Sequence, residues 1–186
     1  MPKIIKGYES PVFQKYDYNI AAQTFIFNNL PTDKLPKTPG GNSLTGDRPD
    51  DLDPTLVKAM ITEETNDGTL EVKYGQKGKS DIMQANVTTT SGQTDWSAEK
   101  KDWGLEKGKS ATPNQSVYAG IRLLYTKGLK TVVNGKVTSV TWRGDDWNEA
   151  VKKYNGGGNK NYLKEVLDYF LNATDPTSDN YVKKKK

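Results

Sequence analysis

Leu52-Asp-Pro-Thr-Leu-Val-Lys-Ala-Met-Ile-Thr-Glu-Glu-Thr-Asn-Asp-Gly68 is the segment around which we interpret the rest of the chain. Asp53 is a good N-cap, because its carboxylate can accept hydrogen bonds from the free backbone N–H groups of a first helical turn. Pro54 follows at the first helical position, where its fixed φ suits a helix. Gly68 is a typical stop signal. The apolar residues between them recur at helical spacing and predict one apolar stripe: Leu56, Val57, Met60 and Ile61.

Two glutamates, Glu63 and Glu64, follow at the end of this stripe. The C-terminal end of a helix favours cations, so an acidic side chain is unfavourably placed there. A carboxyl group at the edge of an apolar face should also have a raised pKa, because burial disfavours its charged form. These conditions are those of a general acid.

The remaining elements predict a mainly α (α+β) fold. Thr112-Pro113 begins a helix with a cap and an N1 proline, and Gly128 ends it. Asn134-Gly135, within the β-branched segment 131–142, predicts a type I′ hairpin. Alternating apolar residues predict a short strand over 69–74.

Two more helices are predicted near the end of the chain. Asp145 or Asp146 caps the first, which ends in Tyr154-Asn-Gly-Gly-Gly158. These glycines permit the left-handed turn that stops a helix. The second covers residues 159–172.

We expect three parts in the chain. Residues 1–50 form an N-terminal arm or linker, because the chain from 31 to 51 is rich in Pro, Gly, Asp and Thr. This arm either wraps the body or serves as an adaptor for delivery. Residues 51–175 form the main domain, and residues 176–186 form a basic disordered tail.

Composition restricts the chemistry. The chain has no cysteine and no histidine, which excludes a Ser–His–Asp triad, a Cys–His pair and any Cys- or His-ligated metal site. Acid–base chemistry must therefore fall to Asp, Glu, Lys or Tyr. We expect no cofactor and no metal ion.

The net charge of +4 comes from the end of the chain, since Lys183 to Lys186 supply four positive charges and 4 − 4 = 0. A neutral body gives little support to nucleic-acid binding. No apolar run approaches the roughly 18 residues that a membrane span requires.

The combined motifs resemble the catalytic domains of soluble lytic transglycosylases and goose-type lysozymes. In that lysozyme-like superfamily, a helix that begins with Asp-Pro ends in Glu-Ser, and a Gly-Leu-Met-Gln run and a Tyr-Asn-Ala-Gly motif follow. Here the corresponding residues are Glu64-Thr65, Asp81-Ile82-Met83-Gln84 and Tyr154-Asn155-Gly156. The resemblance implies a lysozyme-like domain with a small β-region after the catalytic helix and an inserted hairpin, which either faces solvent or lines the glycan cleft with Trp142.

The resemblance also implies roles for individual residues. Glu64 would be the catalytic acid, since the family register selects it over Glu63. Gln84 and the Met83 backbone would hold a sugar near this acid. Tyr154 would bond either the glycan or the catalytic carboxylate. The predicted substrate-binding residues are Thr65, Met83, Gln84, Asn86, Tyr154 and Asn155.

An inverting hydrolase needs a second carboxylate that activates water. The positions that carry aspartates in goose-type enzymes are here Gly75 and Asn86, neither of which is acidic. This favours the transglycosylase route, in which one glutamate acts first as acid and then as base. The other candidates for a second carboxylate are Asp67, Glu71 and Asp81, although Asp81 could simply cap its turn.

The expected function is cleavage of the β-1,4 bond between N-acetylmuramic acid and N-acetylglucosamine in peptidoglycan, as a secreted antibacterial effector or phage lysin. The alternatives are a goose-type muramidase, a catalytically weak glycan-binding module, and an enzyme acting on chitin. The expected partners are glycan strands, with an immunity or inhibitor protein or a secretion apparatus as further candidates. Residues 1–7 lack the apolar core of a signal peptide, so we expect synthesis in the cytoplasm, export by a non-Sec route and action in the periplasm or cell wall.

Overall fold

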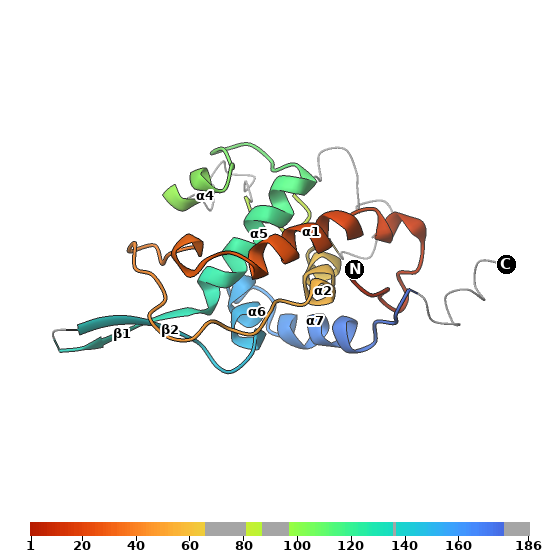
Figure 1. Cartoon of the computed structure of the whole chain (residues 1–186). Helices are drawn as coiled ribbons and strands as arrows, with labels where there is room; N and C mark the ends of the chain where they lie inside the picture. Colours follow the sequence, from red (N-terminus) through yellow and green to blue (C-terminus); the bar gives the residue numbers. More distant parts are fainter. Residues whose placement is uncertain (66–80, 87–96, 136, 177–186) are drawn as a thin grey trace.

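The computed structural model describes residues 1–65, 81–86, 97–135 and 137–176. This part of the chain is mainly helical and contains a two-stranded antiparallel sheet (Figure 1). The prediction of a mainly α fold with a β-hairpin is therefore confirmed. The strand predicted over 69–74, the helix stop at Gly68 and the tail from residue 177 lie outside the described residues.

Helix α2 (Pro54–Thr65) lies at the centre of the molecule (Figure 1). Its start is as predicted: the Asp53 carboxylate accepts a hydrogen bond from the Thr55 backbone N–H at 2.6 Å, and Pro54 is the first helical residue. The prediction of a single apolar stripe was too narrow, because residues 55–62 are all buried. Helices α1 (Asp17–Asn28) and α7 (Tyr162–Leu171) pack against α2.

Helix α5 (Pro113–Gly128) is the second main element and is also as predicted. Thr112 and Gln115 form a reciprocal capping box, which satisfies two backbone N–H groups that the first turn leaves free. Helices α1 and α6 (Asn148–Tyr154) pack on α5. At its end, a Cβ atom on Gly128 would lie 2.1 Å from the Trp142 ring, so the close approach of the hairpin requires glycine there.

The structure differs from the expectation that residues 1–50 form a separate arm. Short 3₁₀ turns (Pro11–Gln14 and Thr32–Lys34) flank α1, and the segment contributes to the same core as α2 and α5. Its buried residues in that core are Ile5, Phe13, Ile20, Phe27, Leu35 and Leu44. The core therefore has no boundary at residue 50. Of the two alternatives for residues 1–50, wrapping around the body agrees with this shared core.

Polar contacts hold this segment against the later helices. The Asn28 side chain bonds both the backbone N–H and the carbonyl of Leu52, at 3.0 and 3.1 Å, immediately before α2. A buried ion pair joins α1 to α2, with Lys58 Nζ 2.8 Å from an Asp17 carboxylate oxygen. Ile4 pairs with Thr174 in an isolated antiparallel bridge, which joins the start of the chain to the segment after α7.

The hairpin consists of β1 (Leu129–Asn134) and β2 (Val137–Trp142) and extends away from the helices (Figure 1). Asn134 pairs with Val137, so the loop begins at Gly135, one residue later than predicted. Gly135 has a φ of 61°, which glycine adopts without steric cost. Trp142 is packed against Tyr125 and Trp147, with ring centroids 5.4 and 4.9 Å away, so its ring lies among aromatic neighbours.

The last helices begin slightly later than predicted. The N-cap residue of α6 is Trp147, which makes no side-chain capping bond, so the prediction that Asp145 or Asp146 caps this helix is wrong. Asp146 lies one residue before the cap, and its carboxylate oxygen accepts a hydrogen bond from the Asn148 N–H at 2.8 Å. Helix α7 begins at Tyr162 rather than at residue 159, and the short helix α4 (Ala98–Asp102) precedes α5. None of the helices in the described ranges combines the length and apolar character that crossing a bilayer requires.

Candidate active site

Glu64 lies in the last turn of α2 and faces α7. Its Oε1 atom accepts a hydrogen bond from the Tyr162 hydroxyl at 2.7 Å. Burial raises the pKa of Glu64 to about 6; the bond from Tyr162 opposes this rise, and the negative charge of Asp81 adds to it. A carboxyl group with this pKa is protonated in an appreciable fraction of molecules near neutral pH, as a general acid requires.

A cavity of about 390 Å³ opens at this carboxyl group. We call it the Glu64 cavity. Four of its lining residues were predicted as site residues from the sequence, although they are up to 91 positions apart (155 − 64). Leu123 and Lys127 of α5, together with Gly156, complete the lining. The predicted residues that line it are Glu64, Gln84, Tyr154 and Asn155.

Gln84 enters the cavity from a tight turn over residues 81–86. Its backbone has a φ of 51°, the left-handed region that side chains other than glycine rarely adopt. Its side-chain amide donates to the Asp81 carbonyl at 2.8 Å. Within the described parts of the chain, no donor bonds the amide oxygen of Gln84.

The Asp81 carboxylate holds this turn together. It accepts hydrogen bonds from the Ser116 hydroxyl at 2.6 Å and from the backbone N–H groups of Ala85 and Asn86 at 2.8 and 2.7 Å. Asp81 is buried and does not line the Glu64 cavity. Of its two interpretations, the cap of the turn is therefore the one that the contacts support.

Met83 is a positioning residue in this geometry. Its side chain is fully buried, its N–H donates to Ser116 Oγ at 2.8 Å, and its carbonyl accepts from the Tyr154 hydroxyl at 2.7 Å. The Tyr154 hydroxyl therefore fixes the turn that carries Gln84, and Tyr154 also lines the Glu64 cavity.

Besides Met83, two further predicted binding residues do not line the Glu64 cavity. The Thr65 hydroxyl donates to the Ile61 carbonyl at 2.7 Å, within its own helix. The Asn86 amide is buried and donates to the carbonyls of Glu106 and Lys109 at 2.9 and 2.7 Å. Both side chains satisfy backbone groups, so the prediction that they contact substrate is not supported. Asp67 and Glu71 lie outside the described residues.

Glu63, the rival of Glu64, lies on another side of the helix. Burial and the adjacent Glu165 carboxyl raise the pKa of Glu63 to about 7, more than that of Glu64. The Asn159 amide lies between the two, 3.3 Å from Glu63 and 2.6 Å from Glu165. Glu63 does not line the Glu64 cavity, and its raised pKa comes first from burial and then from the Glu165 carboxyl group at the α2–α7 contact. Geometry therefore favours Glu64.

Tyr162 is the site residue that the sequence analysis did not identify. It lies within the last predicted helix and is buried, with 3% of its surface exposed. Burial and the nearby Glu64 raise the pKa of Tyr162, which keeps its hydroxyl protonated as a donor. Its position, eight residues after Tyr154 and beyond a glycine-rich turn, is the only sequence signal that points back to the cavity.

The turn over residues 81–86 rests directly on α5. A Cβ atom on Gly120 would lie 2.6 Å from Met83 Sδ and 2.7 Å from Met83 Cβ. We expect Gly120→Ala to lower the free energy of unfolding by about 1–3 kcal/mol, because Met83 Cβ cannot rotate away and the surrounding core is tightly packed. Urea unfolding monitored by circular dichroism measures this change.

Gly46→Ala is the matched control, since a Cβ atom on Gly46 would meet nothing within 4 Å. We expect its unfolding midpoint to stay within error of the wild type. A Gly120→Ala protein as stable as Gly46→Ala would contradict the close contact between α5 and the turn.

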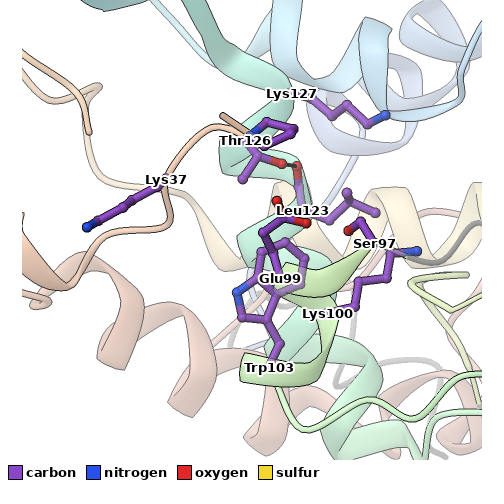
Figure 2. Close-up of a pocket in the computed structure, with 9 residues that line it drawn as sticks. Lys37, Ser97, Glu99, Lys100, Trp103, Leu123, Thr126 and Lys127 are labelled. Carbon is purple, nitrogen blue, oxygen red and sulfur yellow. Dashed lines mark hydrogen bonds between the residues drawn. The ribbon is translucent and has the colours of Figure 1, made fainter. Parts of the chain in front are cut away.

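A second cavity, of about 210 Å³, adjoins the first, because Leu123 and Lys127 line both. We call it the Trp103 cavity. Figure 2 shows Glu99, Lys100 and Trp103 from α4 and its C-terminal end on one side, and Leu123, Thr126 and Lys127 from α5 on the other. The two cavities are thus neighbours at Leu123 and Lys127 of α5.

The chain was compared with protein-family models, with curated proteins and with solved structures, and none of them matched it. Within the described ranges, no three acidic side chains are grouped so as to hold a metal ion.

Proposed function

We propose that this chain has a lysozyme-like fold and cleaves the β-1,4 bond between N-acetylmuramic acid and N-acetylglucosamine in peptidoglycan. One observation carries the proposal. Glu64, whose carboxyl group has a raised pKa, lines a cavity that Gln84, Tyr154 and Asn155 also line. These residues come from three separate segments and match the order of motifs in lytic transglycosylases and goose-type lysozymes.

In this proposal Glu64 acts first as an acid. Its proton passes to the glycosidic oxygen, and the bond from C1 of N-acetylmuramic acid to that oxygen breaks with its electron pair on the oxygen. The Glu64 carboxylate then takes the proton of the 6-hydroxyl group on the same muramic acid. The hydroxyl oxygen forms a bond to C1 and closes a 1,6-anhydro ring. Glu64 returns to its protonated state.

Two contacts support this one-carboxylate route over hydrolysis. The Asp81 carboxylate is occupied by three hydrogen-bond donors, and Glu63 is paired with Glu165 away from the cavity. Glu64 is thus the only carboxyl group among the described residues that line the Glu64 cavity. A muramidase, the alternative, would draw its second carboxylate from Asp67 or Glu71.

Product analysis tests the proposal. Purified cell-wall sacculi are incubated with the protein, and the soluble fragments are identified by mass spectrometry. We expect fragments with 1,6-anhydro-muramic acid ends. Fragments with reducing ends would contradict the transglycosylase route and support the muramidase alternative. Sacculi that remain intact would contradict cleavage and support the glycan-binding module. Chitin oligomers offered in parallel test the other glycan, and we expect them to remain uncleaved.

The pH profile of the wild type tests the state of Glu64. Because the acid form of Glu64 must donate a proton, we expect kcat/KM to fall as the pH rises through about 6. The Tyr162 hydroxyl bond stabilises the charged carboxylate and lowers the pKa of Glu64. Tyr162→Phe should therefore raise this pKa and move the falling limb to higher pH.

Tyr169→Phe is the control for this profile. Tyr169 also lies on α7, and its hydroxyl is 3.4 Å from that of Tyr8, whereas the hydroxyl that bonds Glu64 is that of Tyr162. We expect its pH profile to match the wild type. A Tyr162→Phe limb that stays in place, or moves to lower pH, would show that this bond does not set the protonation of Glu64.

A further inference from the structure

A third cavity, of about 650 Å³, lies next to the Glu64 cavity on the side of α6. Lys127 and Gly156 line both cavities, so the two are neighbours at these residues. We call it the lysine cavity, since four of its eight lining residues are lysines. Its lining residues are Lys127, Glu149, Lys152, Lys153, Gly156, Gly157, Asn159 and Lys160.

The charge of this lining is strongly positive. Its four lysines and Glu149 give a formal charge of 4 − 1 = +3. Glu149 lies 4.0 Å from Lys152 and partly offsets that lysine. Among the described residues, no carboxylate forms an ion pair with Lys127, Lys153 or Lys160.

Helix ends explain only part of this arrangement. Lys127 is in the last turn of α5, and Lys152 and Lys153 are in the last turn of α6, where cations favour the helix dipole. The two C-terminal ends carry together about one negative charge, which leaves the cavity positive by about two charges. Lys160 belongs to neither helix and lines the same cavity from the connection between α6 and α7.

The backbone between the two cavities is open. Gly156 and Gly157 have φ values of 63° and 90°, and a Cβ atom on either would meet nothing within 4 Å. No side chain of these residues therefore separates Glu64 from the lysines. A chain-like ligand that places a bond at Glu64 can place a neighbouring substituent in the lysine cavity.

We propose that the lysine cavity binds carboxylate groups of the peptide stem that peptidoglycan carries on N-acetylmuramic acid. This inference rests on the proposed function, because it takes the glycan at Glu64 as given. The glycan backbone between the cavities is uncharged, whereas the stem peptide is acidic. A cluster of lysines attracts carboxylates through charge at short range. The cavity would thus select glycan strands that still carry their peptides.

Binding to a non-cleaving protein tests this inference. Glu64→Gln protein is titrated calorimetrically with a disaccharide-tetrapeptide fragment and with the same disaccharide whose lactyl carboxyl group carries a simple uncharged amide in place of the peptide. We expect tighter binding of the peptide-bearing fragment. Adding Lys153→Gln and Lys160→Gln should lower the affinity for the peptide-bearing fragment about fivefold, which is the contribution expected of two partly exposed ion pairs. Added salt should also lower this affinity, because it screens the charges.

The matched control adds Lys6→Gln and Lys107→Gln to Glu64→Gln. These lysines are exposed and line neither cavity, and their substitution changes the net charge by the same amount. We expect the control to keep the full preference for the peptide-bearing fragment. A preference lost equally in both variants would overturn the inference, because it would reflect net charge alone.

The remaining outcomes separate the two proposals. Equal affinity for both fragments would overturn the inference and leave the cleavage proposal standing. If neither fragment binds and sacculi stay intact, the proposed function itself is overturned. Wall teichoic acid is the probe for a phosphate source. Binding of this polymer that depends on Lys153 and Lys160, without a peptide preference, would overturn the assignment to peptide carboxylates.

Discussion

Glu64→Gln is expected to lower the release of soluble fragments from sacculi by about 10²- to 10⁴-fold, the usual contribution of general acid–base catalysis. Glutamine has the same shape as glutamate, and its amide oxygen can still accept the bond from Tyr162. The packing of α2 against α7 should therefore persist, while the proton for the leaving oxygen is gone. Fragment release measured by chromatography gives the rate, and circular dichroism confirms the fold.

Glu63→Gln is the matched control, one residue earlier on the same helix. Because Glu63 faces Glu165 and does not line the Glu64 cavity, we expect it to keep most of its activity. If Glu63→Gln were the inactive protein and Glu64→Gln the active one, the assignment of the acid would be reversed. Equal clearing by the wild type and Glu64→Gln would reject a catalytic role for Glu64.

Lys58→Met should produce the largest loss of stability, about 3–5 kcal/mol, because it leaves the buried Asp17 carboxylate without its cation. Lys58 is 1% exposed and Asp17 7%, and the Lys58 ammonium also donates to the Gln14 side chain. Burial lowers the pKa of Lys58 and raises that of Asp17. Urea unfolding at neutral pH measures the loss.

The double variant Lys58→Met/Asp17→Asn separates charge from packing. Removing both charges should recover at least half of the lost stability, since the remaining groups carry no unpaired charge. In Lys58→Met alone, burial keeps the folded-state pKa of Asp17 above its unfolded value of 3.8, so the native state binds the extra proton as the pH falls. The deficit should be smallest below about pH 4 and grow as the pH rises. A deficit independent of pH, with no recovery in the double variant, would assign the loss to packing.

Elements with local signals were predictable from the sequence. Asp53-Pro54 and Thr112-Pro113 fix the starts of α2 and α5 through caps that involve only nearby residues. The hairpin followed from its glycine and its β-branched strands. The loop register was wrong by one residue, because Asn134 pairs with Val137 across the strands.

Features that depend on distant contacts were not predictable in this way. The apolar residues of positions 1–50 are widely spaced, and only packing against α2 and α5 makes them part of one core. Thr65 and Asn86 were predicted to bind substrate because the family pattern places them near the cleft. In the structure, both side chains instead donate hydrogen bonds to backbone carbonyls. Tyr162 was not recognised as a site residue, because a buried tyrosine in a helix looks the same in the sequence whether or not its hydroxyl bonds Glu64.

The left-handed backbone of Gln84 lowers the stability of the fold, whereas the side chain of the same residue lines the Glu64 cavity. A residue with a Cβ atom in this region costs about 1–2 kcal/mol relative to glycine. Selection for thermal resistance alone would therefore favour glycine at this position, which would also delete the amide that reaches the Glu64 cavity. Variants of this protein evolved for heat tolerance should be screened for ligand affinity at each round, because the two properties diverge at Gln84.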